Sequence, residues 1–243
     1  MLNILASEKL KLKHNNLLLI CFSIGLLTLI FSIVTDIYYL NNGGLTKTFY
    51  EWYSSSILLF QLIIFPILSG LVITFLINKE YSDNTILNNL TAPTNRVHFI
   101  LAKIIVWFIW HMLLTISFII ILCLGLNILY GSQLLFNNIY DVFILSLKIS
   151  IFNFLTLIPV TYIAVLQKKK FFYSLIFCFT ITGIGFAGLY WPELLGKVIP
   201  WSAVSLICVS TNSTLGIIPY LSILFCAIIG LILTIFTFKH QEL

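Results

Sequence analysis

Six long apolar segments constrain the fold of this chain more than any other feature of its sequence. An α-helix that crosses a bilayer needs about 20 predominantly apolar residues. Only 9% of the chain is charged, whereas roughly a quarter of a soluble domain is charged. Because backbone polar groups inside a bilayer must be satisfied within the protein, such segments form helices. The sequence therefore predicts an all-α, polytopic membrane protein with six transmembrane helices. The segments are residues 17–34, 55–77, 99–124, 142–166, 171–190 and 216–238.

The basic residues predict the orientation of these helices. Ten of the thirteen lysines and arginines fall on the side that holds both ends of the chain. Lys47 and Lys197 fall on the other side, and Lys148 lies inside the fourth span. Cytoplasmic loops of membrane proteins are enriched in lysine and arginine. We therefore expect both termini in the cytoplasm and the aromatic-rich loops outside.

Two stretches outside the spans are also expected to be helical. Residues 1–16 place leucines on one helical arc that lysines interrupt, which predicts an interfacial helix at the membrane surface. Residues 191–215 are more than a turn requires, and there Pro192 suits a helix start and Pro200 an exit. We expect a short outer or re-entrant helix in this stretch, and a single transmembrane domain over residues 1–243.

The longest polar run between two apolar segments is residues 78–98, NKEYSDNTILNNLTAPTNRVH. Ser82 or Asp83 can cap the N-terminus of a short helix in this run, and Pro93 ends it. Three apolar side chains fall on one face of that helix, namely Ile86, Leu87 and Leu90. A helix of one or two turns is not stable by itself in water. It therefore needs a partner surface, either on its own chain or on another protein.

Polar and amphipathic residues inside the spans are candidates for function, because polar groups are costly in a membrane. The candidates are Trp107, Trp110, His111 and Lys148. His111 is either hydrogen-bonded to a neighbouring helix or, with the two tryptophans, part of a surface that handles an amphipathic substrate. Lys148 is either a structural lysine that reaches outward, toward Asp141 one heptad earlier, or a functional residue.

Prolines and small residues indicate where the helices bend and approach one another. Pro66 and Pro159 free backbone carbonyl groups and should kink their helices, so both are expected to face the bundle. Gly183 and Ala187 form a small-xxx-small pair that suits close helix contact.

Several functional signatures are absent from the sequence. The chain has no Gly-x-x-x-x-Gly-Lys-[Ser/Thr] motif for binding ATP, and none of the common zinc- or serine-hydrolase motifs. Its five cysteines show no spacing typical of a metal site. Every acidic residue lies at or outside a span boundary, so no carboxylate relay for protons is present. The sequence therefore favours neither an enzyme nor an ion-driven carrier, and its small positive charge does not indicate nucleic-acid binding.

The topology and the 78–98 run together resemble the type-2 ABC exporter permeases. In that family the stretch after the second span contains glutamate, threonine, a leucine-rich turn, proline and arginine in this order. The matching residues here are Glu80, Thr85, Leu87, Leu90, Pro93 and Arg96. Size, the lack of a fused ATPase and the low-GC-like composition are most similar to the bacterial lantibiotic and peptide-antibiotic self-protection permeases.

The resemblance implies that residues 78–98 dock on a separate cytoplasmic ABC ATPase. That partner would bind ATP and magnesium, whereas this chain would bind no cofactor or metal. The apolar side chains of the run would enter a groove on the ATPase. Glu80 and Arg96 would fix the orientation of the run by charge-assisted hydrogen bonds.

The resemblance also implies a second permease, either an identical copy or a paralogue, because six spans make half a transporter. The pair would lie in the lipid of a bacterial cell membrane and export amphipathic peptide antibiotics or similar hydrophobic compounds. The alternative is a non-transporting anchor or sensor subunit that recruits a cytoplasmic partner through the same run. Substrate-stimulated ATP hydrolysis distinguishes the two.

Overall fold

The computed structural model describes residues 16–42, 48–82, 96–131, 136–168, 170–209 and 215–241, and every regular element in these ranges is helical. The predicted all-α class is confirmed. In chain order the elements are α2 (Asn16–Asn41), α3 (Phe49–Leu59), the π-turn η1 (Phe60–Ile64), α4 (Phe65–Ser82), α6 (Arg96–Tyr130), α7 (Phe136–Gln167), α8 (Phe172–Ala187), the 3-10 turn η3 (Gly188–Tyr190), α9 (Glu193–Val198), α10 (Pro200–Val209) and α11 (Ile218–His240).

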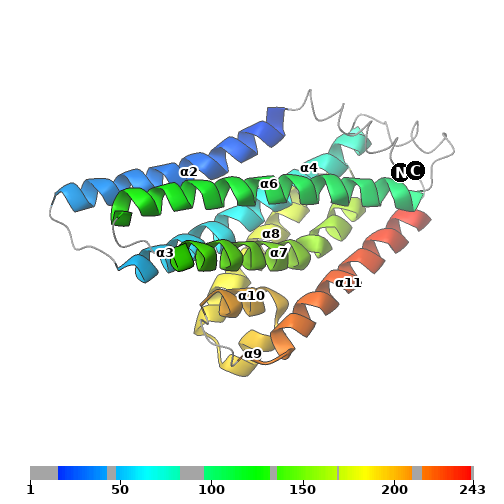
Figure 1. Cartoon of the computed structure of the whole chain (residues 1–243). Helices are drawn as coiled ribbons and strands as arrows, with labels where there is room; N and C mark the ends of the chain where they lie inside the picture. Colours follow the sequence, from blue (N-terminus) through cyan, green and yellow to red (C-terminus); the bar gives the residue numbers. More distant parts are fainter. Residues whose placement is uncertain are drawn as a thin grey trace.

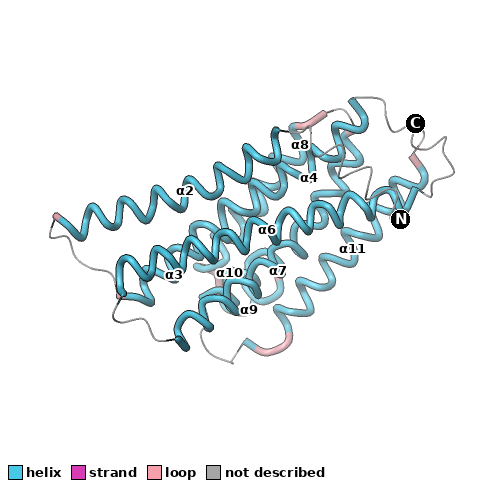
Figure 2. The backbone as a smooth tube through the Cα atoms, turned by 45° about the horizontal axis from the view of Figure 1, so that its top comes forward, coloured by secondary structure: helices cyan, strands magenta, loops and turns pink. Residues whose placement is uncertain are grey.

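Six of the described helical stretches are long and apolar enough to cross a membrane, so the predicted number of spans is confirmed. They are Asn16–Asn41, Tyr50–Ser82, Arg96–Tyr130, Ile139–Gln167, Phe172–Tyr190 and Ile218–His240. The second span combines α3, η1 and α4. The spans lie lengthwise beside one another in a bundle (Figures 1 and 2). An even number of spans places the start of α2 and the end of α11 on the same side of the membrane.

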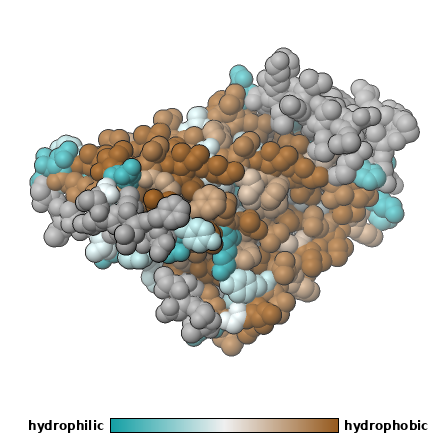
Figure 3. All heavy atoms as spheres, in the orientation of Figure 1, coloured by the Kyte–Doolittle hydropathy of each residue, from teal (hydrophilic) through white to brown (hydrophobic). Residues whose placement is uncertain are grey.

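The surface of the bundle is apolar, as lipid contact requires. Figure 3 shows hydrophobic residues over most of the visible face, and large side chains such as Leu19 are 69% exposed. The interior is filled by aromatic and branched side chains. The largest of those that are fully buried are Trp52, Trp107, Phe60, Phe65 and Phe118.

Two glycines allow helices of the bundle to approach closely. A Cβ atom on Gly70 of α4 would lie 2.0 Å from the Cys178 Sγ atom of α8, and one on Gly230 of α11 would lie 2.8 Å from the Pro159 nitrogen of α7. The prediction that Gly183 and Ala187 form such a contact is wrong within this chain, because a Cβ on Gly183 would meet nothing within 4 Å. Its place is taken by Gly188, where a Cβ would lie 2.1 Å from the Ser202 Cβ of α10.

Both prolines face other helices of the bundle. Pro66 is buried in the first turn of α4, directly after η1, where the chain makes i→i+5 hydrogen bonds in place of i→i+4 bonds. Pro159 lies inside α7, and its ring atoms contact the Gly230 backbone region of α11. A proline cannot donate the hydrogen bond that an interior helical residue donates. The π-turn at Phe60–Ile64 therefore lies where the backbone bonding pattern of the second span is interrupted.

The stretch between the last two spans holds two short helices, where one was expected. Pro192 caps α9, as predicted, but Pro200 begins α10 and does not end a helix. The Ser202 hydroxyl donates to the Gly196 carbonyl oxygen over 2.9 Å and joins the two helices. The buried face of α10 packs against α3, α7, α8 and α11. The interfacial helix predicted for residues 1–16 lies, apart from its last residue, outside the described residues.

Candidate functional site

The residues predicted to contact an ATPase fall partly outside the described structure. Residues 83–95 are not described, so the predictions for Thr85, Ile86, Leu87, Leu90 and Pro93 remain predictions. Glu80 and Arg96 are described, at the end of α4 and the start of α6. The structure therefore shows how the two stems of the 83–95 segment are held.

Glu80 forms a buried ion pair with Lys103. The Lys103 Nζ atom lies 2.7 Å from the Glu80 Oε1 atom, and the two side chains are only 3% and 5% exposed. Lys103 also lies 5.4 Å above the centroid of the Phe99 ring. Removing one partner of such a pair leaves an uncompensated buried charge, which is costly. The pair therefore fixes the last turn of α4 against the second turn of α6.

Arg96 binds the end of α11. Its Nη1 atom donates to the Lys239 carbonyl oxygen over 3.2 Å and to the Gln241 carbonyl oxygen over 3.0 Å. The last carbonyl groups of a helix have no partner within the helix, and a cation near them is favourable. Arg96 thus ties the start of α6 to the end of the last span.

Two further residues of α4 bind the same end of the bundle. The Tyr81 hydroxyl donates to the Gln241 Oε1 atom over 2.5 Å, and the Gln241 side-chain amide donates to the Val165 carbonyl oxygen of α7 over 3.3 Å. The Asn78 side-chain amide donates to the carbonyl oxygens of Lys168 and Lys170, over 2.9 and 3.1 Å, in the turn between α7 and α8.

These contacts form one polar group, which we call the anchoring cluster. Its members are Asn78, Glu80, Tyr81, Arg96, Lys103 and Gln241. The cluster joins α4, α6, α7, α11 and the α7–α8 turn at the end of the bundle where the 83–95 segment begins and ends. Of these residues, the sequence analysis singled out Glu80 and Arg96. Tyr81, Asn78 and Gln241 were missed, because nothing in their spacing shows that residues far apart in the chain meet.

The mid-span candidates Trp107 and His111 are buried in the bundle. Both side chains are 0% exposed. The Trp107 indole N–H donates to the Ser69 hydroxyl of α4 over 2.8 Å, and the His111 Nδ1 atom lies 3.1 Å from the same oxygen. The His111 Nε2 atom lies 3.0 Å from the Ser150 hydroxyl of α7, which is 2.6 Å from the Thr115 hydroxyl. These side chains hold α4, α6 and α7 together, and a substrate would reach them only if those helices separated.

Trp110 and Lys148 lie at different places from this core. The Trp110 indole N–H donates to the Leu18 carbonyl oxygen of α2 over 3.3 Å, so its polar edge is already bonded. The Lys148 ammonium group donates to the Tyr220 hydroxyl of α11 over 3.2 Å, where an interaction with Asp141 had been expected. The structure therefore does not bring the four mid-span candidates together in one site.

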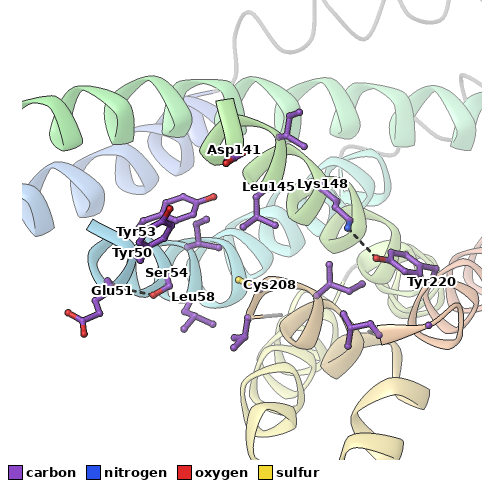
Figure 4. A pocket seen from close by; sticks show the side chains of 16 residues that line it. Tyr50, Glu51, Tyr53, Ser54, Leu58, Asp141, Leu145, Lys148, Cys208 and Tyr220 are labelled. Carbon is purple, nitrogen blue, oxygen red and sulfur yellow. Dashed lines mark hydrogen bonds between the residues drawn. The ribbon is translucent and has the colours of Figure 1, made fainter. Parts of the chain in front are cut away.

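Lys148 instead lines a pocket at the end of the bundle opposite the anchoring cluster. The pocket has a volume of about 970 Å³ and is formed by α3, α7, α10 and α11 (Figure 4). Tyrosine side chains and two carboxylates line it together with apolar side chains. Over the described ranges no group of three or more potential metal ligands is present.

The comparisons with known proteins agree with this architecture. A family model described as ABC-2 family transporter protein matches residues 4–185. The chain is also 28% identical, over 201 residues, to the bacitracin transport permease protein BCRB of Bacillus licheniformis, an alignment that covers 80% of this chain and 93% of that protein. The resemblance to type-2 ABC exporter permeases is thereby confirmed. With its six apolar helices, the chain is a multi-pass cell-membrane protein that belongs to the ABC-2 family of transporter proteins.

Proposed function

We propose that this chain is the permease subunit of an ATP-driven exporter of amphipathic peptide antibiotics or similar hydrophobic compounds. Membership of the ABC-2 family supports a transporter permease subunit that works with an ABC ATPase. The Bacillus licheniformis relative is a bacitracin transport permease protein, which supports a cargo of this kind. The ATPase would bind ATP and magnesium and would dock on residues 78–98 of this chain.

The anchoring cluster is the observation that carries this proposal. The stems of the 83–95 segment are bonded on one side through Glu80 and Tyr81 and on the other through Arg96 and Lys103. The Glu80–Lys103 pair joins α4 to α6, and Tyr81 and Arg96 bond the end of α11. There Gln241 in turn donates to the Val165 carbonyl oxygen of α7. A displacement of the segment by an ATPase would therefore move several spans together. A loop that merely connected two helices would not need a buried ion pair and further bonds to another span at its stems.

The export pathway would be completed by a second permease, either a copy of this chain or a paralogue. Six spans correspond to half of a transporter in the family that the chain resembles. The exposed apolar side chains of the described spans can lie against lipid or against such a partner.

The apolar face of residues 78–98 provides the test. Burying one leucine contributes about 1.5–3 kcal/mol, and placing a carboxylate in an apolar groove costs several kcal/mol more. Leu87→Asp should therefore weaken ATPase binding by at least tenfold to a hundredfold, since about 1.4 kcal/mol corresponds to a factor of ten. Asn88→Asp, on the polar side of the same predicted turn, is the matched control.

The measurement is the amount of ATPase recovered with the tagged permease, together with antibiotic resistance in cells. If Leu87→Asp retains as much ATPase as Asn88→Asp does, residues 78–98 are not the docking element. Substrate-stimulated ATP hydrolysis by the purified complex separates an exporter from a non-transporting anchor or sensor. A complex whose hydrolysis never responds to substrate would contradict the export function.

A further inference from the structure

The pocket at the far end of the bundle is the feature that the proposed function leaves unused. Its volume of about 970 Å³ lies at the upper end of the roughly 300–1,000 Å³ typical of small-molecule sites. Its walls combine apolar side chains with a few polar groups, as binding sites for small molecules do. Figure 3 shows hydrophilic residues interrupting the apolar face of the molecule in this region.

Charged groups are distributed unevenly along the pocket. Glu51 lies in the first turn of α3, and Figure 4 shows its side chain pointing away from the tyrosines of the pocket. Asp141 lies seven residues before Lys148 on α7, a separation of about 10 Å along the helix axis. Lys148 lies nine residues into the span that begins at Ile139, about 14 Å along the helix. The carboxylates are therefore near the end of the bundle, and the ammonium group lies deeper.

Lys148 has a neutral partner and no carboxylate partner within the described part of the chain. Its Nζ atom donates to the Tyr220 hydroxyl over 3.2 Å and lies 5.3 Å from the centroid of the same ring. An ammonium group that is partly withdrawn from water gains most from a negatively charged partner. A ring and a hydroxyl orient the group but do not neutralise it.

The apolar part of the wall lies beside this cation. The apolar residues that line the same pocket and keep accessible surface include Leu58 of α3, Ile144 and Leu145 of α7 and Val209 of α10. The Tyr53 hydroxyl donates to the Val142 carbonyl oxygen over 3.3 Å and fixes the wall between α3 and α7. Among the residues that the structure describes, the pocket thus offers one cation and a hydrocarbon-lined volume next to it.

We propose that this pocket binds an amphiphile whose anionic group, a phosphate or a carboxylate, pairs with Lys148. The apolar part of the ligand lies along Leu58, Ile144, Leu145 and Val209. The Tyr220 hydroxyl, which now accepts from Lys148, can donate its proton to the same anion. Binding is a property of the permease alone, so it does not depend on ATPase docking at residues 78–98.

The test uses the purified full-length permease in a neutral maltoside detergent. Dodecyl phosphate and dodecyltrimethylammonium have the same chain and opposite charges, and their binding is measured by native mass spectrometry and by calorimetric titration. We expect one dodecyl phosphate to bind per chain and at least tenfold weaker binding of the cationic probe. Equal binding of both probes would overturn the proposal.

Variants at Lys148 connect this binding to the pocket. Lys148→Gln should weaken dodecyl phosphate binding at least tenfold, whereas Lys148→Arg, which keeps the charge, should retain it. Lys197→Gln is the matched control, because Lys197 lies on α9 outside the pocket and is already paired with Glu193, whose pKa it lowers. If Lys148→Gln and Lys197→Gln bind the probe equally, or if a folded Lys148→Arg does not bind it, the inference is wrong. The melting temperature of each variant shows that it is folded.

The same preparation identifies the source of the ligand. An acidic lipid that copurifies with the wild-type protein and is lost in Lys148→Gln would assign the site to membrane lipid. Stimulation of ATP hydrolysis in the complex by the anionic probe, lost in the same variant, would assign it to exported cargo. Either result supports the site, and the binding measurement on the permease alone stands even if the export function fails.

Discussion

The buried pair of Glu80 and Lys103 gives the sharpest test of how the bundle is held at the anchoring cluster. Glu80→Ala leaves the Lys103 ammonium group buried without the carboxylate that lies 2.7 Å away. Breaking a buried pair in this way costs about 3–5 kcal/mol. For a chain of this size about 1 kcal/mol corresponds to 2–4 °C in melting temperature, so the expected decrease is roughly 6–20 °C.

A double variant separates stability from coupling. Replacing a buried ion pair by apolar residues of similar volume is often neutral or stabilising. Glu80→Leu combined with Lys103→Met should therefore recover most of the melting temperature that Glu80→Ala loses. If the pair also transmits ATPase movement, this stable double variant should still hydrolyse ATP without a matching level of transport.

The assay is a thermal melt of the purified permease, followed by substrate-stimulated ATP hydrolysis and transport of the reconstituted complex. A change of less than about 2 °C in Glu80→Ala would refute the burial argument, because it corresponds to 1 kcal/mol or less. A double variant with normal transport would show that the pair is structural and plays no part in coupling.

Three further predictions concern packing, the polar interior and the topology. Gly70→Ala should destabilise the protein by about 1–3 kcal/mol, since its Cβ would lie 2.0 Å from the Cys178 Sγ atom; adding Cys178→Ala should restore much of the melting temperature, and no rescue would argue against this contact. His111→Ala should lower abundance and melting temperature, because it removes a fully buried side chain together with its hydrogen bonds to the Ser69 and Ser150 hydroxyls; a change only in substrate preference would contradict that role. On a cysteine-free background, a cysteine replacing Lys47 should be labelled from outside intact cells and one replacing Asn88 should be protected. Labelling of the cysteine at position 88 from outside would contradict the predicted orientation.

The spans were predictable because hydrocarbon length and apolar composition are properties of short stretches of sequence. The orientation of a small residue around its helix was not. Gly183 was predicted as a contact residue, yet Gly188, which was not predicted, is the glycine that packs against α10. A shift of a few residues turns a side chain to another face of the helix, and the sequence does not say which face another helix will cover.

The prolines show the same limit. Pro200 was expected to end a helix and instead begins α10, because proline is tolerated in the first turn as well as after the last one. The sequence signal is therefore the same for a start and an exit.

The candidate site was predictable in its location but not in its bonds. Glu80 and Arg96 were expected at the stems of the 83–95 segment, and the structure places them there. Their partners are Lys103 and the end of α11, which are 23 residues from Glu80 and up to 145 residues from Arg96. Lys148 was likewise expected near Asp141 on its own helix and bonds Tyr220, 72 residues away. Such pairings depend on how the spans are arranged, which local spacing does not encode.

The π-turn at Phe60–Ile64 has a consequence for comparing this chain with its relatives. It accommodates one residue more than an α-turn, and one residue corresponds to a rotation of about 100° around the helix axis. A relative that lacked this residue and formed a regular α-helix there would present the equivalent side chains of α4 to α6 and α8, because the π-turn absorbs the extra residue locally. A gap of a single position in an alignment near residues 60–64 would then mark the loss of the π-turn, with the helical phase of α4 retained. On the far side of such a gap, equivalent roles, including those of Ser69 and Glu80, would be found one position away from where a gapless alignment places them.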